Sequence, residues 1–83
     1  GVATVVTVRL QPDTPLPAVR AMLVVHALDG AAGVIGIHPA SFDDTFDGVL
    51  HIFLAAAADA DAVRATVDRA GDIESVEVRP VAA

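Results

Sequence analysis

The 83-residue chain contains no cysteine, lysine, tryptophan or tyrosine. Without cysteine it can form neither a disulfide nor a thiolate metal site, and it is compatible with a reducing compartment. Five arginines against eleven acidic residues leave a formal net charge of −6. Because nucleic acids and anionic lipids are bound through basic patches, we expect neither as a partner. A basic protein surface is the better electrostatic match.

Long apolar runs are also missing. No stretch reaches the roughly 20 residues that a helix needs to cross a bilayer, and much of the 54% hydrophobic content is alanine, so no membrane insertion is expected. No basic and apolar leader begins the chain, which together with the lack of cysteine predicts a cytoplasmic location. We expect residues 1–83 to form a single domain with one core, cut from a longer protein.

The order of the predicted elements indicates the fold. Alternating, β-branched segments predict strands, and apolar periodicity between capping residues and glycine predicts helices. In chain order these are a strand at 2–10, a helix at 15–28, strands at 34–38 and 49–54, a helix at 59–70 and a strand at 73–81. This order predicts an α+β, ferredoxin-like βαββαβ sandwich, with a four-stranded antiparallel sheet and two helices on one face.

Some details of these elements follow from individual residues. Asp13 or Thr14 can cap the first helix, Pro15 suits its first turn, and Gly30 is expected to end it. In the third strand two faces compete for the core, because both are apolar. One face carries Leu50, Ile52 and Leu54, and the other carries Val49, His51 and Phe53.

The second helix shows the clearest pattern. Asp59 or Asp61 is expected to cap it, and Gly71 to follow its end. Arg64 and Asp68 are four residues apart, a spacing that predicts an ion pair on the solvent side.

No catalytic motif is present. We find no glycine-rich phosphate loop, no Ser/His/Asp arrangement and no metal-spaced ligand cluster, so we expect neither an enzyme nor a cofactor. His26, His38 and His51 are the candidates for metal or proton chemistry. His38 and His51 fall on neighbouring strands, and two histidines with scattered carboxylates can in principle bind zinc. Isolated polar positions are the favoured interpretation.

The first helix is apolar on two sides. At 100° per residue, one side carries Leu16, Arg20, Leu23, Val24, Ala27 and Leu28, and the opposite side carries Ala18, Ala21, Met22, Val25 and Asp29. Since a two-layer domain buries only one side of a helix, we predict that the second set is exposed and contacts a partner. The alternative is a helix rotated about its axis, with that stripe in the core.

Two segments of the chain resemble a known family. Residues 8–28, VRL…TPLPAVRAMLVVHAL, resemble the first strand and helix of the CheY-docking domain of the chemotaxis histidine kinase CheA, typically V-x-L…T-x-L-x-x-A-R-x-x-L-V-x-H-x-L. Residues 70–78, AGDIESVEV, are similar to the closing A-D-I-x-x-V-x-V of that family.

The resemblance implies a specific role. A domain of this family binds the response regulator CheY without any catalysis of its own, and raises the local concentration of CheY for phosphotransfer by the parent kinase. We expect a monomeric domain. From the apolar stripe on the first helix, we expect the binding surface to be centred on Ala21, Met22 and Val25, with Ala18 and Asp29 beside them.

A second family with this topology is the ACT type of small-molecule-binding regulatory domain. Residues 13–16 lie where such domains place a ligand-binding turn, but Leu16 stands in place of the usual glycine after the proline. Because ACT domains pair side by side, a stable dimer would favour this alternative.

Overall fold

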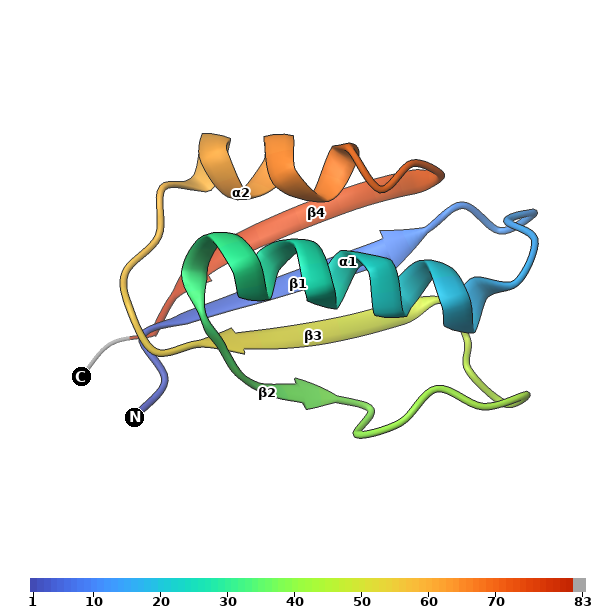
Figure 1. The fold of residues 1–83 in the computed structure, drawn as a ribbon, viewed down its shortest axis with the longest axis horizontal. Coiled ribbons are helices and arrows are strands. Elements are labelled where there is room, and N and C mark those ends of the chain that lie inside the picture. The colour runs from blue at the N-terminus through green and yellow to red at the C-terminus, as the bar shows by residue number, and fades with distance from the viewer. Residues whose placement is uncertain (82–83) are drawn as a thin grey trace.

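The computed structural model describes residues 1–81, so the last two residues of the expected domain lie outside the described part. The six elements are β1 (Thr4–Leu10), α1 (Pro17–Ala32), β2 (Val34–His38), β3 (Val49–Leu54), α2 (Ala60–Asp68) and β4 (Ile73–Pro80). The strands form one sheet in the order β2-β3-β1-β4, and every neighbouring pair is antiparallel. Both helices cover the same face of this sheet (Figure 1), which confirms the predicted ferredoxin-like sandwich.

The core lies between the sheet and the two helices. Successive side chains of a strand point to opposite faces, so β1 and β3 each bury alternate residues. The buried apolar residues are Val6, Val8, Leu10, Ala21, Val24, Leu28, Leu50, Ile52, Leu54, Val63 and Val67. The even-numbered residues of β3 therefore face the core, which settles the choice that its two apolar faces left open.

The N-terminus of α1 differs from the prediction. The helix begins at Pro17, and neither Asp13 nor Thr14 caps it. Its N-cap is Leu16, in a left-handed conformation (φ 52°, ψ 60°) with no side-chain cap. The reason is Pro17, because a proline disfavours the right-handed helical conformation in the residue before it. Because Pro17 keeps Leu16 out of the helical conformation, Pro15 also lies outside the helix.

The C-terminus of α1 lies further along the chain than expected. Gly30 is an interior helical residue, and the helix continues to Ala32. An interior glycine costs about 1 kcal/mol relative to alanine, but two alanines follow it, and alanine is the best helix former. Gly33 ends the helix with a φ of 70°, and its N–H donates to the carbonyl of Asp29.

Helix α2 is capped by Asp59, one of the two residues predicted for this role. Asp59 Oδ2 accepts a hydrogen bond from the Ala62 N–H at 3.1 Å. The expected pair between Arg64 and Asp68 is wrong, since Arg64 Nη1 lies 3.9 Å from Asp61 Oδ1. Helical side chains lean toward the N-terminus of their helix, which takes Arg64 back toward Asp61.

Replacing the cap should destabilise the domain measurably. We expect Asp59→Ala to lower the free energy of unfolding by about 1 kcal/mol, because the Ala62 N–H loses its acceptor. Urea unfolding followed by circular dichroism measures the change. Asp61→Ala is the matched control, and we expect it to cost only a few tenths of a kcal/mol. Equal effects of the two substitutions would contradict the capping role.

Candidate protein-docking surface

Helix α1 leaves a row of large apolar side chains in solvent. Val19, Met22 and Leu23 are 54%, 45% and 49% exposed, and His26 is exposed in the next turn. Spacings of three and four residues place all four on one side of the helix. We call these four residues the outer face of α1. Leu16, the residue just before α1, is 72% exposed and lies at the N-terminal end of this face.

The predicted stripe on α1 is only partly exposed. Its members were Ala18, Ala21, Met22, Val25 and Asp29. Ala21 is fully buried in the core, so its assignment to an exposed surface is wrong. Ala18 and Val25 are half-buried, and Val25 packs against the core. Met22 and Asp29 are exposed as expected, whereas Leu23, expected on the core side, faces solvent.

Arg20 gives a physical reason for this rotation. Its Nη2 lies 3.2 Å from Asp72 Oδ2, and its Nη1 donates to the carbonyl of Ala70. These contacts hold one side of α1 against the turn between α2 and β4. With Arg20 directed there, Val24 and Leu28 lie over the sheet, and Leu23 turns outward.

Acidic residues border the outer face. Asp29 lies near the C-terminal end of α1, where its Oδ1 accepts from the Val34 N–H at 2.9 Å. Near the N-terminal end, Asp43 and Asp44 line a cavity of about 260 Å³ together with Leu16 and Val19. The apolar row therefore has negative charge at both ends.

The loop between β2 and β3 holds this charge in place. The Thr45 hydroxyl donates to Asp43 Oδ1 at 2.6 Å, and the Thr45 N–H donates to the same oxygen at 2.9 Å. Both bonds favour the ionised form and hold the pKa of Asp43 below its usual value. Phe42 and Phe46 pack on each other, with ring centroids 4.8 Å apart, and against the core.

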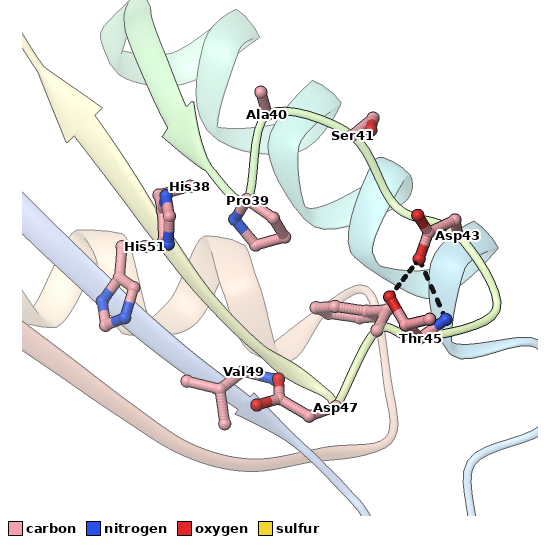
Figure 2. Close-up of a pocket in the computed structure, with 10 residues that line it drawn as sticks. His38, Pro39, Ala40, Ser41, Asp43, Thr45, Asp47, Val49 and His51 are labelled. Carbon is pink, nitrogen blue, oxygen red and sulfur yellow. Dashed lines mark hydrogen bonds between the residues drawn. The ribbon is translucent and has the colours of Figure 1, made fainter.

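The three histidines lie in two places. His26 belongs to the outer face of α1. His38 and His51 are paired across β2 and β3, as expected, with ring centroids 6.1 Å apart (Figure 2). Among residues 1–81, no three histidine or acidic side chains are grouped closely enough to hold a metal ion. Nor is any helix in this part of the chain sufficiently long and apolar for a membrane span.

Val19, Leu23 and His26 are the residues of the outer face that were not predicted from the sequence to contact a partner. Their spacing with Met22 was visible in the sequence, but the assumed rotation of the helix placed Leu23 on the buried side.

These features define a class of protein. A row of large apolar side chains exposed on one helix of an acidic α+β domain indicates a protein-interaction module. The model of one family, the P2 response regulator binding domain, matches residues 3–80, and the chain belongs to this family.

One solved structure supports the same fold. The chain is similar to the chemotaxis kinase CheA P2 domain in complex with the response regulator CheY from the thermophile Thermotoga maritima. The TM-score is 0.79 at 24% identity, and the match covers 98% of this chain and 100% of that chain. No curated protein sequence matches the chain. Family membership decides against the ACT-like alternative.

Proposed function

We propose that this domain docks the response regulator CheY through the outer face of α1. Membership of a response regulator binding family supports the class of partner, and the similar Thermotoga domain forms a complex with CheY. The observation that carries the proposed site is the exposed row of Val19, Met22 and Leu23. Of the residues first assigned to the site, Met22 and Asp29 stay in this proposal.

The proposed role in the parent protein is tethering. The domain belongs to a longer, cytoplasmic histidine kinase, whose other domains carry the ATP site and the phosphorylated histidine. A regulator held on a flexible linker reaches an effective concentration in the millimolar range. Affinity on the order of micromolar, about −8 kcal/mol, suits a partner that must leave after each phosphotransfer. Weaker binding of phosphorylated CheY than of unphosphorylated CheY would drive its release.

The charge of the domain indicates the complementary surface. With a net charge of −6 and acids at both ends of the apolar row, the fitting surface of CheY is apolar at its centre and basic around it. Such complementarity speeds encounter more than it strengthens the final complex, so the association rate should fall as salt is added.

A titration of the ¹⁵N-labelled domain with unphosphorylated CheY tests this proposal. We expect amide shifts centred on Val19, Met22, Leu23 and His26, saturating with micromolar affinity. Absence of binding at about 1 mM CheY would exclude the docking function. Binding with shifts confined to another surface would keep the function and reject the outer face as its site.

A further inference from the structure

A polar row crosses the face of the sheet that the helices leave uncovered. His38 of β2 pairs with His51 of β3, His51 pairs with Thr7 of β1, and Thr7 pairs with Glu77 of β4. Because the even-numbered residues of β1 and β3 face the core, the odd-numbered Thr7 and His51 face the other way. Four polar side chains, one from each strand, thus form a row across the sheet, on the side away from the outer face of α1.

The two histidines of this row are close enough to share a metal ion. Their ring centroids are 6.1 Å apart and the ring planes are inclined by 33°. With a Zn–N bond of about 2.0–2.1 Å, two imidazoles on one ion have centroids about 5–6 Å apart, depending on the angle at the metal. Figure 2 shows the rings next to each other at one side of the loop that joins β2 and β3. The separation of the two ring centroids is therefore just above this range.

Thr7 holds His51 in an orientation suited to this role. Its Oγ1 lies 3.0 Å from His51 Nδ1, within hydrogen-bonding distance. When Nδ1–H donates to Thr7, the lone pair for a metal is on Nε2. Histidine ligands of metals commonly have such a partner on the second nitrogen, which orients the ring and raises its basicity.

The surroundings of the pair suit a cation with water ligands. Both rings line an open cavity of about 420 Å³, together with Asp43 and Asp47. His38 is exposed and His51 half-buried, so solvent reaches the rings. Since no third histidine or acidic side chain within residues 1–81 completes a cluster, water would fill the other coordination positions.

We propose that His38 and His51 form a two-imidazole site for a divalent transition-metal ion, Zn²⁺ or Cu²⁺, on the open face of the sheet. Imidazole suits these ions, whereas Mg²⁺ and Ca²⁺ prefer oxygen ligands. The order of affinities for such ligands makes Cu²⁺ the tighter of the two. The site lies on the opposite side of the sheet from α1, so a metal ion and CheY can bind at the same time.

Calorimetric titration of the 83-residue domain with ZnCl₂ alone tests the site. We expect about one equivalent of Zn²⁺ to bind, and binding to weaken at least about tenfold in both His38→Asn and His51→Asn. His26→Asn is the matched control, because it removes a histidine from α1 and should leave Zn²⁺ affinity unchanged. The imidazole ¹⁵N shifts of His38 and His51, and not those of His26, should move on titration.

Several outcomes would overturn the proposal. Unchanged Zn²⁺ affinity in His38→Asn excludes the pair, and this variant alone decides the question if His51→Asn fails to fold, since His38 is exposed on an edge strand. An equal loss in His26→Asn also excludes it. Displacement of Zn²⁺ by excess MgCl₂ would assign the binding to carboxylates instead.

Discussion

Met22→Asp is expected to weaken CheY binding by at least about tenfold and to leave the domain folded. Met22 is 45% exposed and lies on the outer face of α1. A carboxylate there would lose its hydration in the complex, and it would sit unpaired against the apolar centre of the partner surface. A tenfold loss corresponds to about 1.4 kcal/mol. Calorimetry with unphosphorylated CheY measures the affinity.

Two controls separate docking from stability and from charge. Aspartate in an exposed helical position costs less than about 1 kcal/mol of unfolding free energy, so urea unfolding of Met22→Asp should differ little from the parent. Ala65→Asp adds the same charge on α2, where Ala65 is exposed, and we expect it to change CheY affinity less than about twofold. Equal weakening by both substitutions would indicate long-range repulsion and would contradict docking on α1.

Val25→Asp, at the centre of the stripe predicted from the sequence, is a poorer test of docking. Val25 is half-buried and packs against the core. A charge there costs stability as well as any contact with a partner, so loss of binding would have two explanations. Met22 avoids this ambiguity.

Much of the fold could be predicted from local patterns. The strand β1 alternates with a period of two, and α2 carries Val63 and Val67 at a helical spacing after an aspartate cap. In each of these elements, burial and local propensity agree. The choice between the two faces of β3 could not be made from the sequence, because both faces are apolar and only pairing with β1 and packing under α1 distinguish them.

The candidate site could be predicted only in part, for a related reason. Helix α1 is apolar nearly all round, so its periodicity does not determine which side is buried. The side was decided by contacts far apart in the sequence, those of Arg20 with Ala70 and Asp72. As a result, Met22 was correctly assigned to the surface, and Ala21 was not.

The rotation of α1 can be tested with two leucines of the same helix, Leu23 and Leu28, which the sequence pattern had placed on the same side. Leu28 is fully buried and Leu23 is 49% exposed. We expect Leu28→Ala to lower the free energy of unfolding by about 2–5 kcal/mol, through lost burial and the cavity that it leaves. Leu23→Ala should cost less than about 1 kcal/mol, because most of its surface is already in water.

The pair is informative because the chemical change is identical in both variants and both sites are interior to the helix, so helix propensity cancels in the comparison. A domain of this size has a total stability of only about 4–12 kcal/mol, so Leu28→Ala should shift the urea midpoint strongly and Leu23→Ala only slightly. Similar losses in the two variants would mean that Leu23 is also in the core, and the outer face of α1 could then not serve as the docking surface.

The same two variants should show the opposite order in CheY binding. As long as Leu28→Ala stays folded, it should keep its affinity for CheY, whereas Leu23→Ala should lose part of it. Stability and binding would then be carried by opposite sides of a single helix.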